Sequence, residues 1–277
     1  MIVSKKRKII SLSIYFGLII ILLIAVFLVP SSNGHEAIED AMKDSVLHEY
    51  NYVLLWGIKL NPGLVSAYLV TALILVIAIL IRIFAIPRFK MIPGKMQLVI
   101  EEIVKFFSNL ANENSPHYNR FLGAYIFGAG VYICIGTLFE LLGIQIIGSE
   151  GQAITLPAPL SDINGAIAIG CFSYLVILFG GIRANKAKGI LLTLKEFSLP
   201  ISMSFRLFGA LLSGLLVTDL VYHYISLSFV LPVVVGVLFT LMHAVVQTYV
   251  LTMLTSLFYG EVSEKKKKIK KSKKAIA

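Results

Sequence analysis

The 277-residue sequence has few charged residues, two cysteines and a single tryptophan. Asp, Glu, Lys and Arg make up 14% of it, well below the roughly 25% of an ordinary soluble domain. Hydrophobic residues make up 57%, and the mean hydropathy is +0.86. This scarcity of charge excludes a soluble globular domain and indicates an all-α polytopic membrane protein. The apolar runs are continuous rather than alternating, which argues against a transmembrane β-barrel.

Motifs of covalent catalysis and of metal binding are also missing. The sequence has no G-x-S-x-G, no H-E-x-x-H, no G-x-x-x-x-G-K-[ST] and no Cys/His cluster. Cys134 and Cys171 both stand in apolar segments without a metal-ligand or redox spacing, so we expect reduced packing residues. We therefore expect no catalytic residues, no metal site and no cofactor.

The formal charge of +10 is located mainly at the two ends of the chain. Of the 25 basic residues, 12 lie in KKRK at 5–8 and EKKKKIKKSKK at 264–274. Basic flanks of this kind mark the cytoplasmic side of a membrane protein, with contact to anionic lipid as a smaller contribution. We expect membrane lipid, and no nucleic acid, among the partners.

Six apolar segments are long enough to cross a membrane, for which about 20 helical residues are needed. They cover about residues 9–29, 64–86, 121–147, 163–182, 190–223 and 226–260. The last two are longer than a perpendicular crossing requires, so we expect them to tilt strongly or to lie partly in the interface. Between the second and third segments, QLVIEEIVKFFSNL at 97–110 has the spacing of an amphipathic interfacial helix.

The charges of the loops predict an orientation in the membrane, and the sequence divides into three segments. Every Lys/Arg cluster falls on one side if both termini are cytoplasmic, and the acidic stretch 30–63 then lies outside. Residues 1–30 form a hydrophobic anchor or a signal-like segment, and its length favours an uncleaved anchor, whereas cleavage would leave five crossings. Residues 31–260 form the membrane domain, and 261–277 form a basic cytoplasmic tail.

Few ionisable or strongly polar groups are expected at membrane depth. They are Glu140, Asp162, Asn164, Glu196, Arg206, Asp219, His223, His243 and Gln247. Some have simple structural interpretations: Asp162, Asn164 and His223 stand near helix ends, and His243 and Gln247 could form interhelical hydrogen bonds. Arg206 is different, because arginine keeps its charge and a cation at the bilayer centre costs roughly 2.5 to 3.5 kcal/mol. Asp219 is too far along the same helix to neutralise Arg206, so we expect a partner elsewhere.

The segment EFSLPISMSFRLFGALLSG, residues 196–214, resembles the arginine-bearing helix of subunit a of F-type ATP synthases. Weaker similarities follow the family's order: RFKMIPGKMQLVIEEIVKF at 88–106, LFELLGIQ and LPAPLSDIN within 138–164, and VQTYVLTMLTSLFY at 246–259. Together they extend over roughly residues 58–260. The first 30 residues and the lysine tail lie outside the pattern.

The resemblance implies an ion-translocating stator subunit in a bacterial plasma (inner) membrane. Its last two helices would tilt against a ring of c subunits, with b subunits of the peripheral stalk as further partners. Arg206 matches the essential arginine that faces the ring's ion-binding carboxylate. Gln247 matches a glutamine near that arginine, Glu196 an acid at the cytoplasmic exit, and Asp162 with Asn164 an outer polar pair. Whether the translocated ion is H⁺ or Na⁺ depends chiefly on the ring, so both remain open.

Three positions depart from the family pattern. Ala210 stands where asparagine is usual, Leu215 where Glu or His is frequent, and Thr240 at the usual position of their partner. Our hypothesis is that a relocated outer half-channel uses four other residues. They are Glu140, Asp219, His223 and His243.

Two other classes of function compete with this interpretation. A secondary transporter or channel would use Arg206 as an anionic-substrate site, but such proteins commonly carry inverted repeats, and no duplication is evident. An intramembrane enzyme with His243 as base would need a nucleophile or a metal set, and neither accompanies it.

Overall fold

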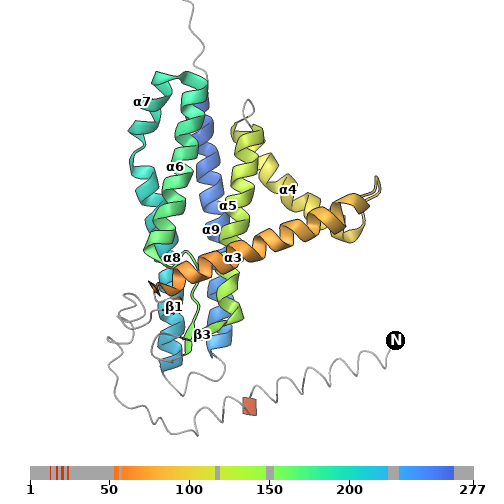
Figure 1. The fold of residues 1–277 in the computed structure, drawn as a ribbon, viewed down its shortest axis with the longest axis vertical. Coiled ribbons are helices and arrows are strands. Elements are labelled where there is room, and N and C mark those ends of the chain that lie inside the picture. The colour runs from red at the N-terminus through yellow and green to blue at the C-terminus, as the bar shows by residue number, and fades with distance from the viewer. Residues whose placement is uncertain are drawn as a thin grey trace, which may run out of the picture. The chain divides into compact units, whose positions relative to one another are not determined.

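The computed structural model describes residues 13, 17, 20, 21, 24, 53–55, 58–115, 119–147, 153–223 and 231–264 (Figure 1). Within these ranges, five helices are long and apolar enough to span a membrane. They cover Pro62–Arg88, Arg120–Leu142, Ile163–Asn185, Ser198–Thr218 and Val233–Ser263. The all-α polytopic prediction is confirmed for these five. The predicted segment 9–29 lies outside the described residues except for five helical positions, and the acidic stretch up to residue 52 and the tail from 265 also lie outside.

Helix α3 (Pro62–Leu80) begins at a local cap, and its end leads into a turn. The Asn61 side chain accepts the Gly63 N–H at 2.8 Å, with Pro62 at the first helical position. A π-turn at Ile81–Ala85 and a 3₁₀ turn at Ile86–Arg88 follow, where Pro87 ends regular helix formation.

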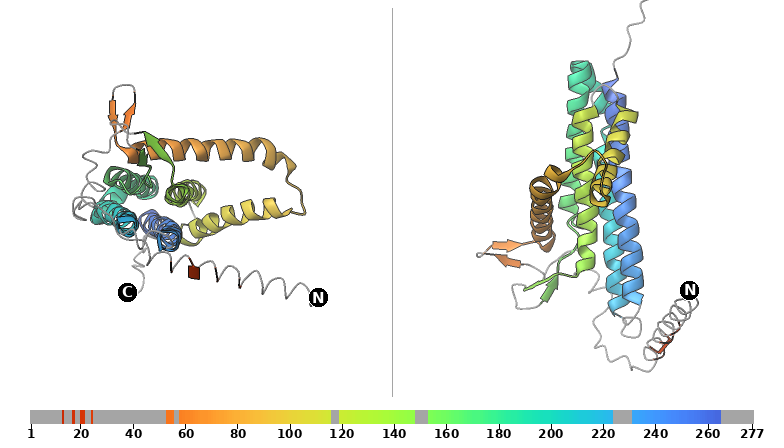
Figure 2. Two further views of the ribbon diagram at one scale, coloured as in Figure 1. Left: turned by 90° about the horizontal axis from the view of Figure 1, so that it is seen from below. Right: turned by 90° about the vertical axis from the view of Figure 1, so that its right-hand side faces the viewer.

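The chain then reverses direction into α4 (Lys95–Asn114), as Figure 2 shows for the end of α3 and α4. The Gln97 side chain closes the turn, because it accepts the Lys90 N–H and donates to the Lys90 C=O, both at 3.0 Å. The predicted amphipathic helix at 97–110 is confirmed and is longer at both ends. Its large apolar side chains remain exposed at Leu98, Val99, Ile103, Val104 and Phe106.

The third predicted span is wrong at its C-terminal end. Helix α5 (Asn119–Phe139) continues only through a 3₁₀ turn at Glu140–Leu142. Gly143 adopts the left-handed conformation with φ 56° and donates its N–H to the Glu140 C=O, which stops the helix. Residues 145–147 form a strand instead of helix.

Two short hairpins are present among the described residues. Strand β3 (Gln145–Ile147) pairs antiparallel with β4 (Ala153–Thr155), and β1 (Val53–Leu55) pairs with β2 (Ile58–Leu60). Each strand has three residues, far fewer than the about ten that a membrane-crossing strand needs. The β3–β4 hairpin therefore belongs to the connection between α5 and the next span, and the β1–β2 hairpin precedes α3.

The predicted segment 190–223 is two helices rather than one. Helix α6 (Ile163–Asn185) is followed by α7 (Ala187–Lys195) and then by α8 (Ser198–His223). Pro200 has no N–H and its ring would clash with the carbonyl of Glu196, so a helix cannot continue through this point. It is accommodated in the first turn of α8, where its N–H would have had no partner.

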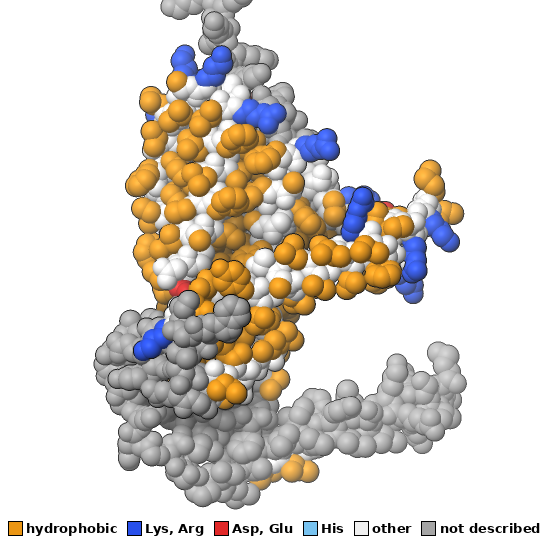
Figure 3. Space-filling view, viewed as in Figure 1, with side chains coloured by type: hydrophobic (Ala, Val, Ile, Leu, Met, Phe, Trp, Pro, Cys, Tyr) orange, Lys and Arg blue, Asp and Glu red, His pale blue; other side chains and the backbone are white. Residues whose placement is uncertain are grey.

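The last helix, α9 (Leu231–Ser263), has 33 residues and is about 50 Å long. Helix α8, with 26 residues, is about 39 Å long. Both are long enough for a tilted crossing; the tilt itself stays a prediction. In Figure 3, hydrophobic side chains cover the visible surfaces of the helices, as expected for surfaces that meet lipid.

The residues group into two units. The first unit contains Met1–Leu73, Cys134–Gly165 and Arg206–Val246. The second contains Ile74–Ile133, Ala166–Phe205 and Gln247–Ala277. The predicted division at residues 30 and 260 stays a prediction.

Hydroxyl groups connect the helices of the second unit. The Tyr125 hydroxyl and Ser173 Oγ are 2.7 Å apart and join α5 to α6. Ser256 Oγ on α9 donates to the Leu110 C=O on α4 at 2.9 Å. Such polar links are worth about 0.6 kcal/mol on average between membrane helices, so packing carries most of the stability.

Glycines allow close approach in the same unit. The Tyr259 ring of α9 lies directly over Gly180 of α6, where a Cβ atom would collide with it. Gly189 of α7 meets the backbone of Gly181 of α6 in the same way. Small residues at these positions let helix backbones and large side chains pack closely without a hydrophobic driving force.

In the first unit, the start of α3 lies against the start of α6. A Cβ atom on Gly63 would be 2.9 Å from the Asp162 Cβ, so a larger residue does not fit without movement. A Cβ atom on Gly136 of α5 would be 3.5 Å from the Pro159 ring, which is an ordinary van der Waals distance. The loop before α6 is thus packed against two helices.

Candidate functional site

Arg206 lies on α8 and is exposed. Exposed residues with small side chains share its helical face at Ser202, Gly209 and Ser213, which follow the spacing i, i+4, i+7, i+11 together with Arg206. Other α8 residues, such as Met203, Leu207 and Leu211, are almost fully buried. Arginine and its small neighbours therefore point away from the part of α8 that packs against this chain.

No carboxylate in the described part of the chain forms an ion pair with Arg206. A Cβ atom on Gly209 would have no atom within 4 Å, so the surface next to the arginine is open. A permanent cation in an apolar span without a carboxylate partner indicates that its partner lies outside the described residues.

Gln247 lies on α9 and is only 6% exposed. No other described residue forms a hydrogen bond with its side-chain amide. A buried amide without a partner costs roughly 1 to 3 kcal/mol, so such groups commonly serve a function or await a ligand.

His243, one turn before Gln247 on α9, lies against α8. Its Nδ1 is 3.3 Å from the position that a Cβ atom on Gly214 would occupy. The Phe239 ring packs edge-on against it, with centroids 6.0 Å apart and an angle of 71°. The absence of a side chain at Gly214 thus leaves room for an ionisable ring next to the arginine-bearing helix.

Asp162 and Asn164 are in contact with each other at the start of α6. Asp162 Oδ1 accepts the backbone N–H of Asn164 at 3.0 Å and its side-chain N–H at 3.2 Å. This arrangement caps α6, because it satisfies an N–H that has no partner within the helix. The two residues therefore have a structural role whatever else they do.

The remaining acids and His223 lie at helix ends. Half-buried Glu140 begins the 3₁₀ turn after α5, and half-buried Glu196 lies in the turn between α7 and α8. Asp219 and His223 are within the last turns of α8, but their side chains lie outside the described part.

The first unit contains most of the residues singled out from the sequence. They are Glu140, Asp162, Asn164, Arg206, Asp219, His223 and His243. The second unit contains Glu196 and Gln247. Within the described ranges, no three His, Cys, Asp or Glu side chains are close enough together to bind a metal ion, and Cys134 and Cys171 are free thiols.

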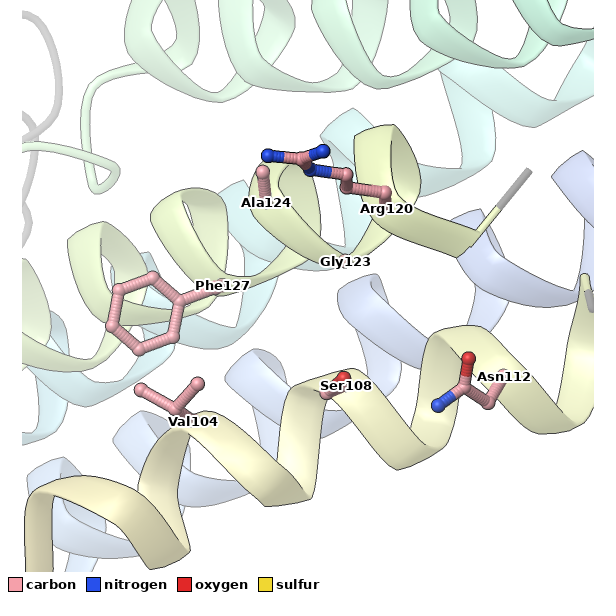
Figure 4. A pocket seen from close by; sticks show the side chains of 7 residues that line it. All are labelled: Val104, Ser108, Asn112, Arg120, Gly123, Ala124 and Phe127. Carbon is pink, nitrogen blue, oxygen red and sulfur yellow. The ribbon is translucent and has the colours of Figure 1, made fainter.

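One feature was missed by the sequence analysis. A cavity of about 410 Å³ lies between α4 and α5 in the second unit. It is lined by Val104, Ser108, Asn112, Arg120, Gly123, Ala124 and Phe127 (Figure 4). Arg120 immediately precedes the span predicted at 121–147 and follows the amphipathic helix, and this position was the available signal.

Comparison with known proteins identifies the family. The profile of the ATP synthase A chain matches residues 66–260, which is more than two thirds of the sequence. The chain belongs to the ATP synthase A chain family. All nine residues singled out from the sequence fall within the matched range, as does the cavity.

Individual members of the ATP synthase A chain family are similar to this chain over most of their length. ATP synthase subunit a proteins from two strains of Cereibacter sphaeroides are 25% identical over 206 residues. Each alignment covers 70% of this chain and 78% of the relative. The resemblance to subunit a is confirmed, and the protein is a membrane protein with five candidate spans among its described residues.

Proposed function

We propose that this chain is the ion-translocating stator subunit of a rotary F-type ATP synthase. It provides two half-channels that load and unload H⁺ or Na⁺ on a ring of c subunits, and so couples the transmembrane ion gradient to rotation and ATP synthesis. The chain breaks no covalent bond itself; the chemistry belongs to other subunits of the complex.

The observation that carries this proposal is the exposure of Arg206 on a face of small residues. Ser202, Gly209 and Ser213 leave room for another helix to approach closely. A carboxylate on that helix would prefer to be neutral in a low-dielectric interface, with a bound proton or cation. A fixed guanidinium favours its charged form, so the ion is released where the carboxylate passes Arg206.

The same cation separates the two half-channels. Each ion that crosses down 100 mV releases about 2.3 kcal/mol, which can drive directional rotation only if ions cannot leak directly between the channels. Arginine suits this role better than lysine, because its guanidinium stays charged and presents a planar fork to a carboxylate. The buried amide of Gln247, which forms no hydrogen bond with another described residue, supports its assignment to the ion path.

We assign the other residues to the two sides of the membrane. Glu196 serves the cytoplasmic half-channel. The outer half-channel uses Glu140, Asp162, Asn164, Asp219, His223 and His243. The packing of His243 against α8 supports its membership, because it brings an ionisable group to the helix that lacks the usual one at Leu215.

The distribution of charge supports one orientation in the membrane. Among the described residues of the first unit, only Lys59 and Arg206 are Lys or Arg. Those of the second unit are Arg82, Arg88, Lys90, Lys95, Lys105, Arg120, Arg183, Lys186, Lys188 and Lys195. We place the connecting turns of the second unit and the C-terminus in the cytoplasm of a bacterial cell.

The decisive experiment replaces Arg206 in the assembled ATP synthase. We expect Arg206→Lys to abolish ATP-driven ion pumping in inverted membrane vesicles, because lysine lacks the fork and can become neutral. Arg88→Lys, an exposed arginine after α3, serves as the control and should pump normally. Coupled ATP synthesis retained in Arg206→Lys would contradict the proposal.

Co-purification from native membranes distinguishes this function from a secondary transporter. A stator should be purified together with a ring of small hairpin subunits and with b subunits of a peripheral stalk. A transporter that uses Arg206 for an anionic substrate would be purified alone or as a small homo-oligomer.

A further inference from the structure

The cavity between α4 and α5 has a polar end and an apolar end. Ser108 and Asn112 of α4 line one end together with the base of the Arg120 side chain, and Val104 and Phe127 line the other end. Figure 4 shows the Val104, Ser108 and Asn112 side chains directed toward α5, while the Arg120 side chain extends along α5 beside Ala124. At about 410 Å³, the cavity falls within the usual range for small-molecule sites.

The polar end of the cavity lies nearer the expected membrane surface than the apolar end does. Arg120 is the first residue of a candidate span, and Phe127 lies seven residues further along it, about 10 Å deeper. Helix α4 is amphipathic with exposed apolar side chains, as expected for a helix in the interface. The polar end therefore lies at the level of lipid headgroups, and the apolar end at the level of acyl chains.

We propose that this cavity binds one anionic phospholipid. Its phosphate accepts hydrogen bonds from the Arg120 guanidinium and the Ser108 hydroxyl, and an acyl chain lies along Val104 and Phe127. Charge complementarity favours this occupant, because a planar guanidinium pairs well with phosphate oxygens. The surrounding second unit is also rich in Lys and Arg. The bound lipid would fix α4 to the start of α5 without taking part in ion translocation.

Gly123 offers a way to fill the cavity. A Cβ atom at this position would meet only the Ala111 Cβ, at an ordinary 3.6 Å, so alanine fits. A leucine side chain would extend further, and because Gly123 lines the cavity, it would occupy the space of the lipid. Gly123→Leu with Gly123→Ala as its control therefore separates occupation of the cavity from loss of the glycine.

The experiment uses the whole ATP synthase complex in lipid nanodiscs. The probes are a phosphatidylglycerol and a phosphatidylcholine, each with a diazirine in one acyl chain. After illumination, mass spectrometry measures adducts on peptides of α4 and α5. Arg120→Gln removes the headgroup contact, and Lys105→Gln on the exposed side of α4 removes a charge that does not line the cavity.

We expect phosphatidylglycerol to label these peptides more than phosphatidylcholine does. Arg120→Gln should lower phosphatidylglycerol labelling about fivefold, the effect of one basic residue near an anionic headgroup. It should lower phosphatidylcholine labelling less, because the choline cation of that lipid already offsets the charge of its phosphate. Gly123→Leu should remove labelling by both lipids, while Gly123→Ala and Lys105→Gln should retain it. Co-purification of the ring with each variant confirms assembly.

Three results would overturn the proposal. Equal labelling by the two lipids would mean ordinary contact with the bilayer. Competition by millimolar inorganic phosphate would mean that the site takes free phosphate rather than lipid. Adducts to a peptide of another subunit in place of lipid would mean that the cavity is a protein interface.

Discussion

His243 is an ionisable side chain that the structure places against α8, at Gly214. We expect His243→Phe to lower ATP-driven pumping by about 100-fold, since a positioned proton carrier contributes at least that factor. The substitution keeps an aromatic ring beside Phe239 and removes both ring nitrogens. Phe239→Leu removes the ring contact without removing a titratable group and should pump normally. Ion uptake by inverted vesicles measures both, and normal pumping by His243→Phe would exclude this histidine from the path.

Asp162 caps α6, and we propose that it also belongs to the outer half-channel. Two substitutions separate these roles. Asp162→Asn keeps an oxygen that accepts the Asn164 N–H but removes the charge. We expect its thermal stability to be unchanged and its pumping to be severalfold slower, because a fixed negative charge concentrates cations at an entrance. Asp162→Ala should also lose about 1 kcal/mol of stability with the cap. If Asp162→Asn pumps at the parental rate, capping is the whole role of Asp162.

Among the elements, the helix centres agree with the hydropathy of the sequence and two helix ends do not. The apolar segment around residue 200 predicts one helix, yet a single proline imposes a break between α7 and α8. Likewise, apolar residues continue to 147, but Gly143 adopts a left-handed conformation and the chain turns into a hairpin. Hydropathy is averaged over many residues, whereas the backbone conformation of a single residue can end a helix.

Two glycines of α9 test the packing of this helix against α4. A Cβ atom on Gly260 would collide with the Asn114 backbone carbonyl, while one on Gly236 would have no atom within 4 Å. We expect Gly260→Ala to lower the free energy of unfolding by about 2 kcal/mol. Gly236→Ala should be neutral, or more stable by up to about 1 kcal/mol through helix propensity. Thermal unfolding in one detergent compares the two variants, and equal midpoints would show that α4 does not limit stability at Gly260.

For the whole molecule, the sequence predicted local features well and long-range contacts poorly. The arginine-bearing helix was found because its residues are contiguous and because a charge in an apolar segment is costly. The contact between Gly214 and His243, and the cavity that joins Ser108 to Arg120, bring together residues on different helices. Neither follows from periodicity, which predicts the face of a helix but not the helix that covers it.

The proposed orientation in the membrane can be tested without measuring ion pumping. Because α5 is long and apolar enough to cross a membrane, we expect its two ends on opposite sides, and the basic turns predict which side is the cytoplasm. With Cys134 and Cys171 replaced by alanine, Lys90→Cys and Lys188→Cys should react with an impermeant maleimide in inverted vesicles and not in intact cells. Ile147→Cys, at an exposed position of β3 beyond the other end of α5, should show the opposite pattern. Labelling of Lys90→Cys from outside the cell would reverse the topology, and Glu196 would then belong to the outer half-channel.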